Sequence, residues 1–148
     1  TRLTKFKRPN DPESKSEGKF DFLGFTHYWA KSKKGSWFVQ RKTASKKLSN
    51  SLRSIGNWCR ENRNRPLREQ HTLLCSKLSG HYQYFGISGN YRSLERFEFH
   101  VKRSWRKWLN RRSQRKSYTW ESFLQCLKAM PLPTPQIHHT FRKAKPTS

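Results

Sequence analysis

The spacing of the apolar residues changes near Thr43, and this change most constrains what the chain can fold into. Before it, residues 20–29 and 37–42 are short runs rich in aromatic residues. The polar, glycine-containing segment 31–36 separates them, so the two runs predict a β-hairpin. Bulky side chains stand close together at the start of the first run and point to both faces, which predicts burial on both sides there; they are Phe22, Leu23 and Phe25.

Beyond Thr43 the apolar residues recur at helical spacing. Leu48, Leu52, Ile55 and Cys59 fall at i, i+4, i+7 and i+11, which predicts a helix over residues 44–62 with Thr43 as its N-cap. A second stripe predicts a helix that ends near Gly86; it consists of Leu74, Leu78, Tyr82 and Phe85. A third predicts a helix over residues 93–113; it consists of Leu94, Phe97, Val101, Trp105, Trp108 and Leu109.

A shorter fourth helix is expected after Thr119, with Trp120, Phe123, Leu124 and Leu127 on its apolar side. The prolines of residues 131–135 favour an extended tail, and we expect no fixed structure from His139 onward. The expected fold is therefore mainly α: a β-hairpin, an antiparallel three-helix bundle, a short fourth helix and an extended Pro-rich tail. Residues 1–43, 44–116 and 117–148 are the expected units.

Lys and Arg number 33 against 9 acidic residues, a formal net charge of +24 among 148 residues. Such self-repulsion disfavours a compact state unless a polyanion screens it, so nucleic acid is the expected partner. Aromatic residues make up 14% of the chain, more than a disordered basic tail would carry.

The three cysteines form no CxxC pair, and no apolar run approaches ~20 residues. We therefore expect no disulfide framework, no zinc finger and no membrane span. We expect a cytoplasmic location.

The basic residues form two candidate nucleic-acid-binding clusters. The first is a ridge along the third predicted helix, opposite its apolar stripe: Arg96, His100, Arg103, Lys107, Arg111 and Arg112. Solvated helix faces normally mix charges of both signs, whereas the acids of this helix occupy only its first turns. The second cluster surrounds the first helix: Arg41, Lys42, Lys46, Lys47, Arg53, Arg60, Arg63 and Arg65. Both could follow a phosphate backbone without reading bases.

To recognise bases, the chain would need other polar side chains, and the candidates are Gln40, Asn50, Asn57, Asn62 and Asn64. Each of them is equally well explained as an ordinary polar surface residue.

The nine acids form no cluster able to hold two divalent metals, so we expect no polymerase or nuclease chemistry from this chain alone. The histidines are scattered apart from the adjacent His138 and His139, and no metal site or cofactor is predicted.

Several short motifs occur in order along the chain: FDFLGF with a hairpin ending in KT, then L..I..W.R.NR, L.GHY.YFG..GN, F...V...W...L.RRS, TW..F and PLP.P.I.H. They extend from about Phe20 to His138, over most of the chain. Together these motifs resemble the C-terminal part of bacterial group II intron reverse transcriptase/maturases. Residues 1–6 resemble the strand that precedes FLGF in that family.

The resemblance implies that residues 20–42 end a palm domain whose primer-grip region includes Phe22, Leu23, Gly24 and Phe25. It implies that residues 44–113 form the thumb, or maturase domain X, which binds intron RNA and the RNA template/DNA primer duplex. The family's fingers and its Mg²⁺-dependent catalytic motif would lie upstream, in the same protein. Two alternatives stay open: a stand-alone RNA-binding splicing factor derived from a maturase, and a non-enzymatic basic domain that packs on an acidic protein.

Overall fold

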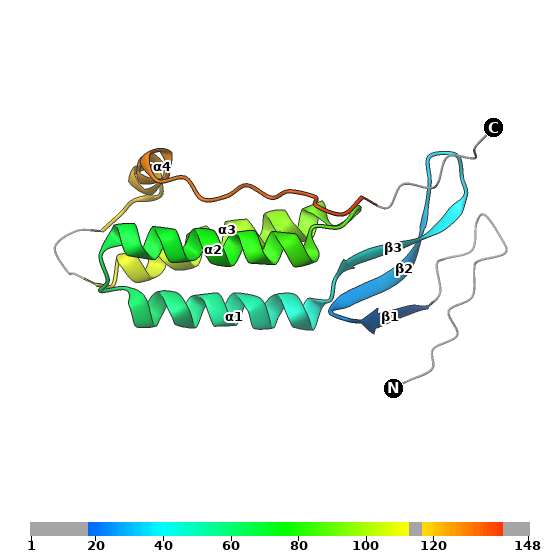
Figure 1. Ribbon diagram of the computed structural model, residues 1–148, viewed down its shortest axis with the longest axis horizontal. Coiled ribbons are helices and arrows are strands. Elements are labelled where there is room, and N and C mark those ends of the chain that lie inside the picture. Colours follow the sequence, from blue (N-terminus) through cyan, green and yellow to red (C-terminus); the bar gives the residue numbers. More distant parts are fainter. Residues whose placement is uncertain (1–17, 113–116, 141–148) are drawn as a thin grey trace.

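The computed structural model describes residues 18–112 and 117–140, which form a three-stranded antiparallel sheet and four helices. The strands, in the order β1-β2-β3, are β1 (Lys19–Phe22), β2 (Phe25–Lys31) and β3 (Trp37–Thr43). The helices are α1 (Ser45–Asn62), α2 (Leu67–Phe85), α3 (Tyr91–Leu109) and α4 (Trp120–Ala129). Helices α1, α2 and α3 lie side by side, and the sheet projects from one end of them (Figure 1). None of the described helices is long and apolar enough to cross a membrane.

The aromatic run predicted as one strand is two strands, so the prediction of a two-stranded hairpin was wrong. β1 turns directly into β2 at Leu23 and Gly24, and Phe22 pairs with Phe25 across the turn. Leu23 has φ 53° and Gly24 has φ 85°, as a two-residue hairpin turn of the I′ type requires. The tight reversal leaves Phe22 and Leu23 60% and 67% exposed, so the predicted burial on both faces was also wrong for them.

The backbone of this turn is fixed to the helices although its side chains are exposed. The Ala44 N–H donates to the Gly24 carbonyl at 2.9 Å, and the Tyr84 hydroxyl donates to the Leu23 carbonyl at 2.7 Å. The half-buried Phe25 ring lies 5.2 Å from the Phe85 ring, between centroids. The turn is thus held against the end of α2.

Thr43 is not the N-cap of α1, which corrects that prediction. Ala44 occupies the cap position without a side-chain hydrogen bond, while Thr43 ends β3 and is buried. The Thr43 N–H donates to Asn90 Oδ1 at 2.8 Å, and Asn90 Nδ2 donates to the Thr43 hydroxyl at 2.8 Å. Asn90 Nδ2 also donates to the Phe85 carbonyl, at 2.8 Å. One buried amide therefore joins β3, the end of α2 and the start of α3.

The predicted apolar stripes meet in one core. The buried core residues of the helices are Ile55, Cys59, Leu74, Leu78, Tyr82, Phe85, Leu94, Phe97, Val101, Trp105, Leu109, Phe123 and Leu127. Trp105 is fully buried; its indole N–H donates to Gln70 Oε1 at 3.0 Å and its ring meets Phe123 edge-on at 5.7 Å. Several residues of the predicted stripes are buried only in part or not at all: Leu48, Leu52, Trp108 and Trp120 are half-buried, and Leu124 is exposed.

The boundaries of α3 and α4 also test the sequence patterns. α3 spans Tyr91–Leu109 rather than residues 93–113, because Asn110 occupies its C-cap. The prediction that Thr119 caps α4 is confirmed, since the Ser122 N–H donates to Thr119 Oγ1 at 3.1 Å.

After α4, residues 131–139 run along α2 toward the sheet (Figure 1). The Pro131 carbonyl accepts from His71 Nε2 at 2.8 Å, and the Pro133 carbonyl accepts from the Tyr82 hydroxyl at 3.0 Å. His139 pairs with Ile87 in a parallel bridge, so the expectation of no fixed structure was wrong at His139. The expected strand at residues 1–6 and residues 141–148 lie outside the described residues.

Candidate nucleic-acid interface

The predicted basic ridge lies on the exposed face of α3. Arg96, His100, Arg103 and Lys107 are exposed on the helix, and Arg111 and Arg112 are exposed just beyond its end. Val101 and Trp105 are buried on the opposite side. Glu98, an acid of this helix, pairs with Lys102 at 2.8 Å rather than with a ridge residue. Phosphates can therefore approach the ridge along the length of the helix.

Trp108 connects the ridge with the far end of α1. The Lys107 ammonium lies 5.1 Å and the Arg111 guanidinium 5.2 Å from the Trp108 ring centroid. Arg63, which follows α1, lies 5.8 Å from the same ring. Cations at these distances are attracted by the negative face of the indole. The structure thus brings members of the two predicted clusters together around one half-buried tryptophan.

Next to the ridge, an open groove separates α3 from α4, with a volume of about 580 Å³. Its lining consists of Phe99, His100, Arg103, Ser104, Arg106, Lys107 and Trp120. The basic spacing on α3 predicted three of these, namely His100, Arg103 and Lys107. Phe99, Arg106 and Trp120 were missed, although an aromatic residue four positions before Arg103 and outside the apolar stripe was a usable signal.

Hydrogen bonds at the start of α4 set the shape of the groove. Arg106 Nε and Asn110 Nδ2 both donate to the Tyr118 carbonyl, at 2.9 and 3.1 Å. The Tyr118 N–H donates to Asn110 Oδ1 at 2.6 Å. These bonds hold Trp120 so that its ring meets Phe99 edge-on, 6.2 Å between centroids. The Arg106 guanidinium lies 6.0 Å from the Trp120 ring.

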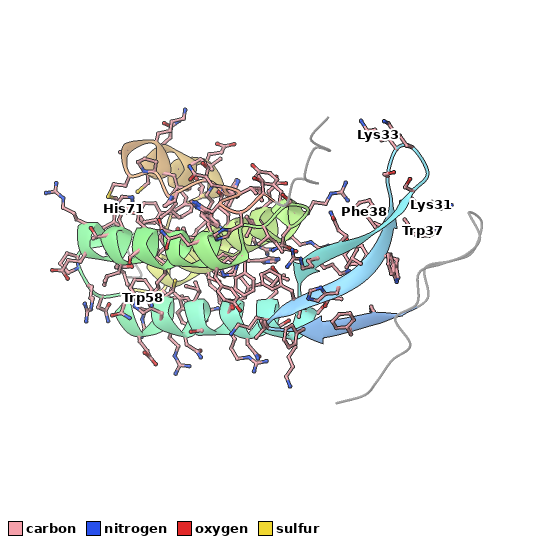
Figure 2. The ribbon with its side chains drawn as sticks, turned by 45° about the vertical axis from the view of Figure 1, so that its right-hand side comes forward. Lys31, Lys33, Trp37, Phe38, Trp58 and His71 are labelled. Carbon is pink, nitrogen blue, oxygen red and sulfur yellow. The ribbon has the colours of Figure 1, made fainter. Side chains whose placement is uncertain are left out.

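The cluster around the first helix is more dispersed. Its exposed members are Lys42, Lys46, Lys47, Arg53, Arg60 and Arg65, whereas Arg41 and Arg63 are half-buried. Arg53 lines a second groove, of about 470 Å³, together with Asn50, Asn57, Trp58 and Lys77. The Lys77 ammonium lies 5.5 Å from the Trp58 ring, which Figure 2 labels between α1 and α2. Of the polar candidates for base reading, this groove contains Asn50 and Asn57, while Asn62 donates to the Trp58 carbonyl at 2.8 Å.

The sheet carries a third group of rings and cations. Lys42 lies 5.2 Å from the Tyr28 ring, and Lys31 lies 4.9 Å from the Trp37 ring. Lys31, Lys33, Trp37 and Phe38 gather at the β2–β3 hairpin, away from the helices (Figure 2). The primer-grip candidates lie at the other end of the sheet, in the turn from Phe22 to Phe25.

The histidine with the most perturbed environment, His81, is half-buried and packs against the helical core rather than lying in the interface. Its ring stacks on Phe97 at 3.6 Å between centroids. Burial, with a smaller contribution from the Lys47 charge, lowers the pKa of His81 to about 4. Within residues 18–112 and 117–140, His, Cys, Asp and Glu side chains form no group of three that could hold a metal ion.

Comparisons of the chain with protein-family models, with curated proteins and with solved structures found no match.

Proposed function

We propose that this chain is the C-terminal thumb/maturase portion of a group II intron reverse transcriptase. In this proposal it binds intron RNA to promote splicing and holds the template/primer duplex during RNA-directed DNA synthesis. The motifs between Phe20 and His138 support the family, and the basic surface supports the binding role. The Mg²⁺-dependent polymerase chemistry belongs to residues upstream in the parent protein.

The observation that carries the proposal is the ridge on α3 and its junction with α1 at Trp108. Arg103 and Lys107 are exposed side by side on one helix, and Arg63 reaches the same tryptophan as Lys107. RNA and RNA/DNA duplexes present phosphates and 2′-hydroxyls across a wide, shallow groove, so a rigid cationic surface can recognise their shape. Because phosphate contacts carry no base information, this surface suits duplexes of many sequences.

The remaining elements receive roles in the same proposal. Helices α1, α2 and α3 form the thumb, α4 and the Pro-rich segment brace it, and the sheet is the end of the palm. The turn at Leu23 and Gly24 is the primer-grip region, with its backbone fixed by Ala44 and Tyr84. Its exposed apolar side chains would contact the duplex end or the rest of the palm. Such a protein would act with its RNA in the cytoplasm.

Filter binding of the full chain to an RNA duplex over a salt series tests the proposal. If about six to ten phosphates are contacted, affinity should fall by ~10³ to 10⁵ between low and moderate salt, because bound cations are released from the RNA. A flat dependence on salt, with tight binding to an acidic polypeptide instead, would support the basic interaction domain. Genetic complementation of intron splicing by the chain alone would support a stand-alone splicing factor.

A further inference from the structure

The groove between α3 and α4 differs from the ridge beside it because it contains exposed ring surface. Phe99 is 48% exposed and Trp120 is half-buried, and the two rings lie edge to face, so neither covers the other completely. A ridge that only follows phosphates needs no rings. Exposed rings among cations are typical of surfaces on which unpaired bases stack.

The cations of the groove are placed around the rings rather than along a line. The Arg103 guanidinium lies 5.6 Å from the Phe99 ring centroid, and Arg106 covers Trp120. His100 and Lys107 lie at the groove wall. Arg106 is also bonded to the Tyr118 carbonyl, whereas Arg103 is exposed on the ridge. Arg103 is therefore the side chain free to move when a planar group enters above Phe99.

We infer that the α3–α4 groove binds a single unpaired base of an RNA whose paired region lies on the ridge. The base stacks on Phe99, and the planar guanidinium of Arg103 moves to cover its other face. His100 and Lys107 contact the flanking phosphates. The volume of about 580 Å³ lies within the usual range for ligand sites, ~300 to 1,000 Å³.

The inference rests on the proposed RNA-binding function and adds the class of RNA. A perfectly paired duplex buries its base faces in its own stack and offers nothing to Phe99. A bulge, loop or strand end exposes a base face next to a helical backbone, which matches a stacking site beside a phosphate-binding ridge. An acidic peptide would match the cations but would leave the exposed rings without a planar partner.

The test compares two RNA stems bound to the full chain, one fully paired and one that differs from it only by a single bulged 2-aminopurine. The bulged stem should bind about 5- to 150-fold more tightly, the range for stacking one base on an aromatic side chain. Its fluorescence should fall on binding, because stacking quenches 2-aminopurine. Phe99→Leu should remove both the preference and the quenching, while affinity for the paired stem and its salt dependence stay unchanged.

Tyr91→Leu is the matched control, since Tyr91 is on the same helix and 46% exposed but does not line the groove. It should retain the preference and the quenching. Arg103→Lys keeps the charge and loses the planar group, so it should reduce affinity for the bulged stem by a larger factor than affinity for the paired stem. Circular dichroism confirms that the variants are folded.

Three results would overturn the inference. Equal, salt-dependent affinity of the wild-type chain for both stems would refute it and leave the proposed function standing. A bulge preference that survives Phe99→Leu would place the base elsewhere. Polyglutamate serves as a probe for an acidic protein. If the wild-type chain binds it and Phe99→Leu does not, while RNA binding is unaffected, the groove belongs to an acidic protein. Salt-independent or absent binding of both stems is a different result, because it refutes the proposed function itself.

Discussion

Two tryptophans have different environments in the two parts of this molecule. Trp105, in α3, is fully buried, donates a hydrogen bond to Gln70 and packs on Phe123. Trp37, in β3, is half-buried near the β2–β3 turn, with Lys31 above its ring. The least exposed of the large apolar residues divide in the same way, although the helices also carry exposed ones such as Tyr84 and Phe99. The fully buried ones belong to helices, whereas Phe20, Phe22, Leu23 and Val39 of the sheet region are exposed.

The difference shows that helices and sheet are stabilised in different ways. The helices share a core to which each contributes a stripe of apolar residues, so the loss of one large side chain affects all of them. The sheet is held by its own ladder and by contacts at one end, through Asn90, Tyr84 and the Ala44 N–H. Substitutions should therefore be costly in the helices and at the junction, and small in the rest of the sheet.

The largest expected effect is that of Trp105→Ala. It removes a buried ring and leaves the Gln70 side-chain oxygen without its donor, so the free energy of unfolding should fall by ~3 to 5 kcal/mol. Urea denaturation followed by circular dichroism measures this. Trp37→Ala is the control in the sheet and should cost less than about 1 kcal/mol. Equal losses in the two variants would contradict the proposed division.

Asn90→Ala should have the next largest effect. It removes the amide that bonds the Thr43 N–H, the Thr43 hydroxyl and the Phe85 carbonyl in a buried place, and unsatisfied buried groups cost ~1 to 3 kcal/mol each. A total loss of ~2 to 4 kcal/mol is expected in the same denaturation experiment. The exposed Asn64, changed to Ala, is the control. A variant at position 90 as stable as the one at position 64 would refute the joining role of Asn90.

The stability of the helical part should depend on pH through His81. Because the folded-state pKa is lowered to about 4 from 6.5, the folded protein favours the neutral ring. This contribution is fully present above pH 6.5 and is lost as the pH falls toward 4, by roughly 2 kcal/mol after allowance for partial exposure. His81→Phe should remove this part of the dependence, which unfolding curves across the window would detect. His100→Gln, an exposed-site control, should keep it.

Leu23→Asn should stabilise the protein slightly, by ~0.5 to 1 kcal/mol. Leu23 has φ 53°, a conformation that costs most residues ~1 to 2 kcal/mol and that Asn adopts more readily. The exposed side chain contributes little, and the bond from Tyr84 goes to the backbone. Leu124→Asn, at an exposed site in α4, is the control and should destabilise by about 0.5 kcal/mol. Thermal melting of the two variants gives the comparison, and a loss at position 23 would contradict it.

The double reversal Arg103→Glu/Lys107→Glu should have the smallest effect on stability, within about 0.5 kcal/mol, because both side chains are exposed. RNA affinity should nevertheless fall at least ~10-fold, since cations that meet phosphates become anions. Filter binding at moderate salt measures this. Lys33→Glu/Lys34→Glu changes the net charge equally at the β2–β3 turn. If both variants weaken binding alike, total charge and not the ridge determines affinity.

The sequence predicted the helices well because their apolar spacing is local information. The apolar stripe of each predicted helix contributes residues to the core. Thr119 caps α4, as its position in the sequence indicated. The turn at Leu23 and Gly24 escaped prediction because leucine rarely adopts positive φ, so Leu-Gly does not look like a hairpin turn. Thr43 was misassigned because its distant partner, Asn90, was invisible to a local pattern.

The candidate site divides in the same way. The ridge on α3 can be predicted from helical periodicity alone, so its basic residues were predicted together. The groove forms only where α4 packs against α3. This packing depends on hydrogen bonds of Arg106 and Asn110 with the backbone of Tyr118. The meeting of Arg63 with Lys107 and Arg111 at Trp108 depends on how α1 packs against α3. Tertiary packing of this kind leaves no periodic signal in the sequence.

The segment from residue 131 to 139 has a consequence for the time course of folding. Its hydrogen bonds with His71 and Tyr82 join residues that are 60 and 51 positions apart in the sequence. This separation is larger than contacts between successive helices need. Contacts of such long range form late. At translation rates of ~5 to 20 residues per second, the 51 positions between Tyr82 and Pro133 take roughly 3 to 10 s to synthesise. For those seconds the side of α2 around Tyr82 lacks the cover of residues 131–139, and such transient exposure favours aggregation of the nascent chain.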